Sequence, residues 1–238
     1  MQLHLTFGGN INLPIAYRSI QQGMIYRALS EADSDYSRYI HDEGQIYQKK
    51  YKLFTFGPLK GRYAIEGKTI IFADAASMEI RSVDERFIRL LAKSMPEGAM
   101  IRLGQNDVKV IRSEMTDYHL LVPRASIRLV APMTVHITLD DGFTRFFEPD
   151  EPEYLQAVLR NARRKWASLH GTEDGFSLSI EPLAGKKRME KTLFRQTYIT
   201  AFYGDYQLSS GSPNVIDLLY QSGLGAKSSQ GFGMFDVK

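Results

Sequence analysis

The sequence predicts an α+β fold of two tandem ferredoxin-like (RRM-like) units with a C-terminal glycine-rich loop. The first half reads strand, helix, strand, strand, helix, strand, which is the element order of the ferredoxin-like unit. The second half repeats this order loosely, in its elements and not in residue identity. The 238 residues suffice for two units of about 120 residues, each with its own core.

The first unit is expected to open with a strand and a helix. Residues 2–7 alternate, with Leu3, Leu5 and Phe7 on one face, which indicates a strand with one buried side. Residues 17–29 have the apolar spacing of a helix. The other elements expected in this half are a short helix at 36–41, strands at 52–56 and 69–72, a helix at 83–95, and strands at 100–103 and 108–112.

One side chain of the first helix is predicted to face away from the core. When residues 17–29 are placed at steps of 100°, Met24 and Ile25 fall within a broad apolar sector. Tyr26 falls on the opposite side of the helix, together with Gln22 and Gly23. The Tyr26 hydroxyl is therefore a candidate functional group.

The second unit is expected to begin near Tyr118, which divides the chain into residues 1–117 and 118–238. The last helix should open at Ser212, a capping residue followed by Pro213, and close at Gly223. The other expected elements are strands at 126–130 and 134–139, a helix at 153–169, and strands at 176–181, 192–203 and 232–237.

Composition limits the function without deciding it. The sequence has 30 lysine and arginine residues against 27 aspartate and glutamate residues, so a polyanionic partner must be met by local basic patches. The absence of cysteine excludes disulfides and cysteine-containing zinc sites. No apolar run is as long as a membrane span, and the first residues read as a strand rather than a signal peptide. We expect a cytoplasmic protein without membrane contact.

The glycine-rich stretch at residues 223–233 is the strongest signal in the sequence. Its glycines allow positive φ and leave backbone N–H groups uncovered, while its polar side chains add a cation and neutral donors, which predicts a loop that binds a phosphate backbone. The spacing fits neither a dinucleotide fingerprint nor a mononucleotide P-loop. A plain turn between a helix and a strand is the alternative. The candidate residues are Gly223, Gly225, Lys227, Ser228, Ser229, Gln230, Gly231 and Gly233.

Basic residues gather in three further places. Two tandem ferredoxin-like units leave a cleft that suits single-stranded or hairpin RNA, and basic side chains on its flanks can follow the phosphates. Solvated surface is the alternative for each cluster. The clusters are Lys49, Lys50 and Lys52; Arg160, Arg163, Arg164 and Lys165 on the helix of the second unit; and Lys186, Lys187, Arg188 and Lys191 on a possible hairpin.

His41 has the most suggestive surroundings among the five histidines. RNA cleavage through the 2′-hydroxyl needs a proton acceptor, a proton donor and a cation for the phosphorane. Histidine, tyrosine and lysine can supply all three, so no metal or other cofactor is predicted. A surface histidine at a helix end is the alternative.

The chain resembles the CRISPR-associated repeat-processing endoribonucleases, the Cas six family. The resemblance rests on the glycine-rich end and, in the first half, on 13–18, 23–26, 39–44 and 52–56, in the family's order and at similar intervals. It implies a metal-independent endoribonuclease that cuts precursor CRISPR RNA within the repeat, leaving a 5′-hydroxyl and a 2′,3′-cyclic phosphate. It also implies that His41 and Tyr26 share proton transfer and that Lys52 stabilises the phosphorane. Effector subunits of the same system and a second copy of the chain are possible partners.

Two other functions fit parts of the sequence. His4 and His136 each begin a His-x-Thr motif on a predicted strand, which resembles the paired motif of two-histidine phosphoesterases. A catalytically silent RNA-binding subunit of a CRISPR complex would keep the glycine loop and the basic clusters while His41 served only the fold.

Overall fold

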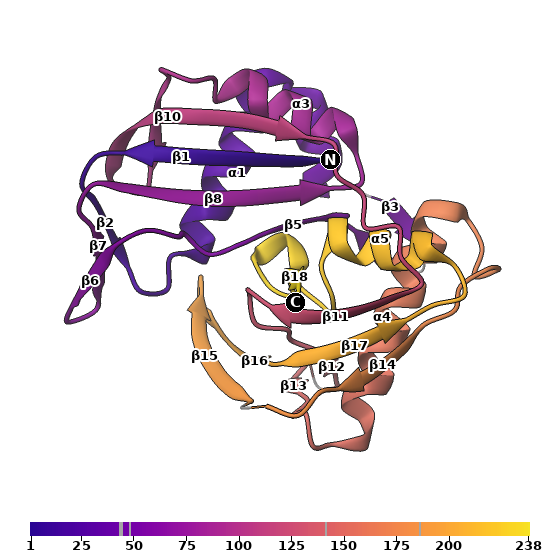
Figure 1. Ribbon diagram of the computed structural model, residues 1–238. Helices are drawn as coiled ribbons and strands as arrows, with labels where there is room; N and C mark the ends of the chain where they lie inside the picture. The colour runs from indigo at the N-terminus through magenta and orange to yellow at the C-terminus, as the bar shows by residue number, and fades with distance from the viewer. Residues whose placement is uncertain (43–44, 48, 141, 186) are drawn as a thin grey trace.

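The computed structural model describes residues 1–42, 45–47, 49–140, 142–185 and 187–238. The side chains of residues 41–50 lie outside this description. Two α+β halves stack on each other, and the C-terminal segment lies between them (Figure 1). Within the described residues no helix combines the length and the apolar character that crossing a membrane requires.

The first half is built on an antiparallel sheet with the strand order β5-β8-β1-β10-β9. Helices α1 (Arg18–Ala32) and α3 (Glu85–Ser94) cover one face of this sheet (Figure 1). Its strands are β1 (Gln2–Gly8), β5 (Phe54–Phe56), β8 (Ala75–Ser82), β9 (Met100–Leu103) and β10 (Asn106–Thr116).

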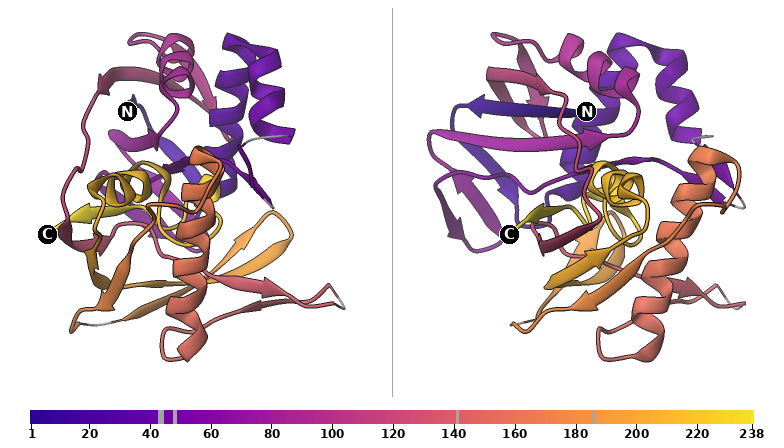
Figure 2. Two further views of the ribbon diagram at one scale, coloured as in Figure 1. Left: turned by 90° about the vertical axis from the view of Figure 1, so that its right-hand side faces the viewer. Right: turned by 45° about the vertical axis from the view of Figure 1, so that its right-hand side comes forward.

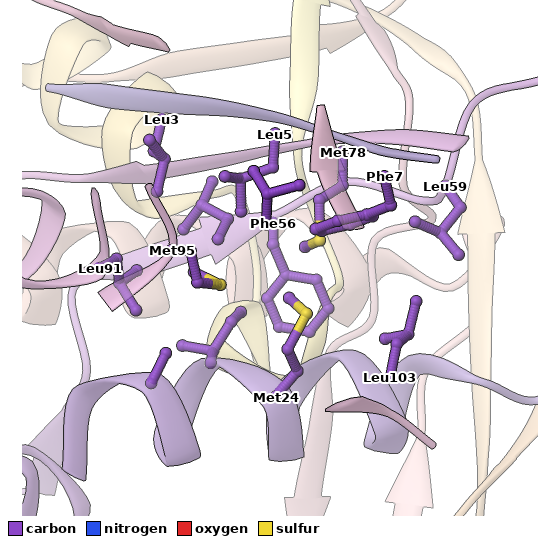
Figure 3. Close-up of a cluster of buried hydrophobic side chains, with 14 of the residues drawn as sticks. Leu3, Leu5, Phe7, Met24, Phe56, Leu59, Met78, Leu91, Met95 and Leu103 are labelled. Atoms are coloured by element: carbon purple, nitrogen blue, oxygen red, sulfur yellow. The ribbon is translucent and has the colours of Figure 1, made fainter. Parts of the chain in front are cut away.

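Alternation along β1 explains the core of this half. Leu3, Leu5 and Phe7 are fully buried and point toward Met24 of α1, while Phe56 reaches in from β5 (Figure 3). This packing confirms the predicted buried face of residues 2–7.

Smaller elements surround the first sheet. A three-stranded sheet has the order β2-β7-β6, and a short helix and a hairpin follow α1. These elements are β2 (Ile11–Pro14), β6 (Tyr63–Glu66), β7 (Thr69–Phe72), α2 (Ser34–Asp42), β3 (Gln45–Tyr47) and β4 (Lys49–Tyr51).

The second half has a four-stranded sheet with the order β14-β17-β11-β18. The long helix α4 (Pro152–His170) and the shorter α5 (Pro213–Ser222) belong to this half (Figure 2). Its sheet strands are β11 (Arg124–Leu129), β14 (Ser179–Pro182), β17 (Asp205–Ser209) and β18 (Phe235–Val237). Two hairpins flank the sheet: β12 (His136–Thr138) with β13 (Thr144–Phe146), and β15 (Arg188–Phe194) with β16 (Thr197–Tyr203).

The two sheets share one topology. In each half the first strand lies between the third and fourth strands of its unit, with the second strand outside the third, as β5-β8-β1-β10 and β14-β17-β11-β18 show. This arrangement and the helices after the first and third strands confirm the predicted tandem ferredoxin-like fold.

The expected element list was wrong at the same place in both halves. The third strand of each unit, β8 and β17, was missing from it, and residues 69–72 proved to belong to the small β2-β7-β6 sheet. Residues 192–203, expected as one strand, form most of the β15–β16 hairpin. Both missed strands follow another strand closely, so their short alternating patterns merged with the preceding element.

Each half has its own hydrophobic core. The first cluster runs from Met1 to Val110 in sequence, and the second from Leu120 to Phe235. A connecting segment joins β10 of the first half to β11 of the second. Asp217 of α5 holds this segment by accepting a 2.7 Å hydrogen bond from the Leu120 N–H. The domain boundary after residue 117 is compatible with these clusters and stays a prediction.

A buried arginine joins the two halves. Arg81 of β8 is 1% exposed, and its guanidinium lies 3.9 Å above the ring of Tyr220 in α5. It donates 2.6 Å hydrogen bonds to the Phe235 carbonyl and to the Asp236 carboxylate on β18, and it also pairs with Glu79. Because a buried charge is tolerated only when it is paired, this cluster sets how the two halves dock.

Candidate functional site

A cavity of about 430 Å³ lies where the two halves meet. The first half contributes α1 and the segment before β5, and the second contributes the turn of the β15–β16 hairpin and the glycine-rich loop. Its lining residues are Gln22, Tyr26, Lys52, Phe194, Arg195, Gln196, Thr197, Ile199, Lys227 and Gln230. The cavity thus collects two of the three predicted catalytic residues and two predicted loop residues.

Tyr26 and Lys52 are neighbours in this cavity. The Lys52 Nζ atom lies 5.1 Å from the centroid of the Tyr26 ring, within the range of a cation–π contact. Burial raises the pKa of the Tyr26 phenol above its ordinary value. The phenol therefore keeps its proton at neutral pH and can donate a hydrogen bond.

Arg195 is a site residue that the sequence did not reveal. It occupies the turn of the hairpin with a φ of 56°, and its Nη2 atom donates a 3.4 Å hydrogen bond to Gln22 Oε1. No glycine marks this turn, so residues 192–203 were read as one strand. The polar pair Arg195-Gln196 between two apolar and β-branched runs was the signal that could have located it.

The charge of the cavity favours an anion. Lys52, Arg195 and Lys227 line it, and no aspartate or glutamate is among the described lining residues. Lys227 is half-buried, and this burial lowers the pKa of its amine from the usual value. Lys52 and Lys227 are half-buried and Arg195 is exposed. Half-buried cations attract a phosphate more strongly than the same charges on an open surface.

The glycines of the loop are needed for packing. A Cβ atom on Gly233 would lie 1.8 Å from the Leu224 carbonyl oxygen, and one on Gly231 would lie 2.6 Å from the Phe56 ring. Gly223, Gly225, Gly231 and Gly233 are all buried and have positive φ. The fold alone thus explains these four glycines, and their contact with RNA stays a prediction.

The remaining loop residues differ in exposure. Lys227 and Gln230 line the cavity, while Ser228 is buried and Ser229 is half-buried. Gln22 of α1 donates a 2.7 Å hydrogen bond to the Ser229 carbonyl. The side chains of Lys227 and Gln230 are therefore the part of the loop best placed to meet a ligand.

Lys165 was wrongly grouped with the solvent-facing cations of α4. Its side chain is 3% exposed, and its Nζ atom bonds the Ser222 and Gly223 carbonyls and Ser228 Oγ. Val158 and Ala162 precede it at helical spacing on the buried face, a pattern that could have shown its burial from the sequence.

Arg163 and Arg164 of the same helix remain accessible to different degrees. Arg163 is exposed, with its guanidinium 5.5 Å from the Phe176 ring. Arg164 is half-buried and interacts with the phenol of Tyr51 in the first half. Arg164 thus lies at the junction of the halves, whereas Arg163 lies within the second half.

Two predicted site residues fall outside what can be described. The backbone of His41 belongs to the last turn of α2, and its side chain lies outside the described residues. One turn earlier, Ser37 Oγ donates a 3.5 Å hydrogen bond to the Tyr26 carbonyl, so α2 packs beside the part of α1 that carries Tyr26. Lys186 lies outside the described residues as well.

The other cations of the third basic cluster lie along β15. Lys187 pairs with Asp150 at 2.5 Å, just before the strand begins. The Arg188 guanidinium lies 4.0 Å above the ring of Tyr203, and the Lys191 Nζ atom lies 5.5 Å from the Tyr198 ring centroid. All three cations are exposed. The hairpin therefore carries positive charge from its base to Arg195 at its turn.

The two histidines of the competing phosphoesterase hypothesis lie in different sheets. His4 is on β1, with its Nε2 atom 3.4 Å from Thr116 Oγ1. His136 is on β12, with its ring 5.6 Å from that of Phe146. Neither contact joins the two halves of the molecule.

Tandem ferredoxin-like halves with a cation-lined cavity at their junction define a class of α+β protein suited to a phosphate-bearing ligand. Residues 121–237 match the family model described as CRISPR associated protein Cas6, C-terminal. The CRISPR-associated endoribonuclease Cas6 1 of Methanocaldococcus jannaschii is 23% identical over 234 residues, covering 93% of this chain and 86% of that protein. Residues 121–237 therefore form a Cas6 C-terminal domain, and the similarity to a Cas6 protein extends over nearly the whole chain.

Solved structures agree with this assignment at the level of the fold. A structure described as CRISPR associated protein Cas6 superposes with a TM-score of 0.78 at 21% identity, covering 100% of this chain and 99% of its own. A second, described as an RAMP protein binding different RNA substrates, reaches a TM-score of 0.82 at 17% identity with the same coverage. Both likenesses extend over the two ferredoxin-like halves.

Proposed function

We propose that this protein is an endoribonuclease that cuts precursor CRISPR RNA within the repeat. The observation that carries the proposal is the meeting of Tyr26 and Lys52 with Lys227 of the glycine loop in one cavity lined by cations. The Cas6 relative named as an endoribonuclease and the RAMP protein that binds RNA support it.

The proposed reaction is attack of a ribose 2′-hydroxyl on the adjacent phosphorus. The O2′–P bond forms and the P–O5′ bond breaks, which leaves a 2′,3′-cyclic phosphate and a 5′-hydroxyl. One group must take the 2′ proton and another must protonate the leaving 5′ oxygen. Cations held near the phosphorane stabilise its added negative charge.

The cavity suggests a role for each described residue. Tyr26 is proposed to protonate the leaving oxygen, because its phenol carries a proton at neutral pH. Lys52, beside the Tyr26 ring, is proposed to stabilise the phosphorane, and Arg195 and Lys227 to hold the flanking phosphates. His41, on the adjoining α2, is proposed as the partner of Tyr26 in proton transfer.

The reaction is tested with a cognate repeat RNA in EDTA. We expect cleavage to continue, since the proposed groups are all amino-acid side chains, and we expect products with the two ends described above. Replacing the scissile nucleotide with its 2′-deoxy form should abolish cleavage while leaving binding intact. Cleavage of the deoxy substrate would contradict attack by the 2′-hydroxyl. Binding without any cleavage of the normal substrate would favour a silent RNA-binding subunit.

Arg195→Ala is expected to weaken RNA binding by about tenfold and to reduce the salt slope by about one unit, because one phosphate contact is lost. The measurement is the dissociation constant of the 2′-deoxy repeat at several salt concentrations. Lys109→Ala provides a matched control, because Lys109 is an exposed cation on β10 of the first sheet. An unchanged affinity and salt slope for the Arg195 variant would remove this residue from the RNA path.

A further inference from the structure

The buried amine of Lys165 is unusual for α4, whose Arg160 and Arg163 are exposed. Its Nζ atom lies within hydrogen-bonding distance of three oxygens: the Ser222 carbonyl at 3.0 Å, and the Gly223 carbonyl and Ser228 Oγ at 2.7 Å each. Burial lowers the pKa of this amine to about 7, so its three hydrogen bonds are what keep it protonated at neutral pH. The two carbonyls belong to the C-terminal end of α5, where a cation also satisfies unpaired acceptors and the helix dipole. One side chain of α4 therefore joins the end of α5 to the turn that follows it.

This turn is held from the other half of the molecule as well. The short helical turn Ser228–Gln230 lies against α1, where Gln22 donates to the Ser229 carbonyl at 2.7 Å. Arg18 of the same helix donates to the Gly231 carbonyl at 3.1 Å. Lys165 and α1 therefore bind consecutive parts of one loop, each from a different half.

Lys227, immediately before the turn, has a conformation that needs such support. Its φ of 59° and ψ of 28° place it in the left-handed region, which is unfavourable for a lysine. Residues in that region persist when the surrounding structure overdetermines them. The next residue in the chain, Ser228, is the one that Lys165 bonds.

We propose that Lys165 is a positioning residue that holds Lys227 in the cavity through the turn Ser228–Gln230. Lys165 is 3% exposed, so this role requires no contact between Lys165 and RNA. Its ammonium anchors Ser228 to the end of α5, and this anchor keeps the preceding Lys227 in its left-handed conformation, with the amine among the cavity-lining groups. The inference rests on the proposed function only where it concerns RNA affinity.

The first test needs no RNA. In Lys165→Met, a side chain of similar length loses the ammonium, and the turn is expected to loosen. The folded protein is treated with an amine-reactive reagent and then digested, and mass spectrometry measures the rate at which the Lys227 amine is acylated. This rate should be several-fold higher in the variant than in the wild type. Exposed Lys68 serves as the internal reference, because its acylation rate should not change. An unchanged rate at Lys227 would overturn the inference whatever the protein's function.

The second test is a double-mutant cycle with the 2′-deoxy repeat RNA. Lys165→Met and Lys227→Ala should each weaken binding by about tenfold, the loss expected for one charged hydrogen bond. Because both act through the same amine, the double variant should bind no more weakly than either single variant. When Lys165→Met is combined with Lys191→Ala, the two losses in binding free energy should add. The reason is that Lys191 lies on the hairpin and does not depend on the turn.

The outcomes separate the two proposals. Suppose that the wild type binds repeat RNA and that the double variant loses affinity by the product of the two single fold-losses. This result would overturn the positioning role of Lys165 and leave the proposed function in place. A wild type without RNA affinity would contradict the proposed function, and the acylation rates would still decide the role of Lys165. If Lys165→Met does not fold, Ser228→Ala removes one of the three acceptors, and the same increase in Lys227 acylation is expected on a smaller scale.

Discussion

His41→Ala is expected to slow cleavage of repeat RNA by about 10²- to 10⁴-fold, the usual contribution of a general acid or base. The Tyr26 phenol carries its proton at neutral pH, so the proton of the 2′-hydroxyl needs a different acceptor. The neutral imidazole of a histidine can accept it. The measurement is the single-turnover cleavage rate with enzyme in excess.

The pH profile distinguishes this role from a structural one. As the base, His41 must be neutral, so the wild-type rate should rise with pH and then level off. The residual rate of the alanine variant should lack this rise, and added imidazole should restore part of the rate. Repeat RNA affinity should match that of the wild type, since the cations that line the cavity remain. Equal cleavage rates for the two proteins would contradict the assignment of His41.

Gly233→Ala is expected to destabilise the protein by about 3 kcal/mol or more, because strain at positive φ and overpacking add together. The residue has a φ of 71°, and the new Cβ atom would lie 1.8 Å from the Leu224 carbonyl oxygen. Backbone hydrogen bonds fix this geometry, since Gly233 bonds Leu224 through its carbonyl and Pro132 through its N–H. The thermal midpoint should fall by about 10 °C.

Gly23→Ala is the matched control for this variant. Gly23 lies on the exposed side of α1, where an added Cβ atom meets nothing within 4 Å, and alanine favours helix. Its thermal midpoint should stay the same or rise slightly. A Gly233 variant as stable as the wild type would mean that the loop relaxes around the new side chain. Packing would then not explain the glycines, and a role in RNA binding would be the better explanation.

Local patterns in the sequence were sufficient for much of the fold. Alternation identified β1. The helical sector of residues 17–29 was wrong in placing Tyr26 on the side away from the core, because Tyr26 is half-buried and packs against the first core at the edge of the cavity that it lines. The glycine-rich end and the histidine region pointed to the family that residues 121–237 match. The missed central strands β8 and β17 have short patterns whose pairing partners are distant in sequence, so no local signal separated them from their neighbours.

The candidate site shows where local patterns were insufficient. Lys165 and Arg164 are adjacent in the sequence and both are basic, yet only Lys165 is enclosed by the end of α5 and the glycine loop. Arg195 entered the site because the hairpin turns at that residue. The glycines proved to serve contacts with Phe56 and with the Leu224 backbone, about which the loop sequence contains no information.

Amino-acid order was thus enough to identify two ferredoxin-like halves, a glycine-rich end and a set of candidate chemical groups, because periodicity and turn chemistry act between neighbours in the chain. The docking of the two halves decided which of those groups share a cavity. Lys52 and Lys227 are far apart in sequence, and they line the same cavity because Arg81, Gln22 and Lys165 hold the C-terminal segment between the halves. Such contacts depend on burial and on partners from distant elements, which exist only after the chain has folded.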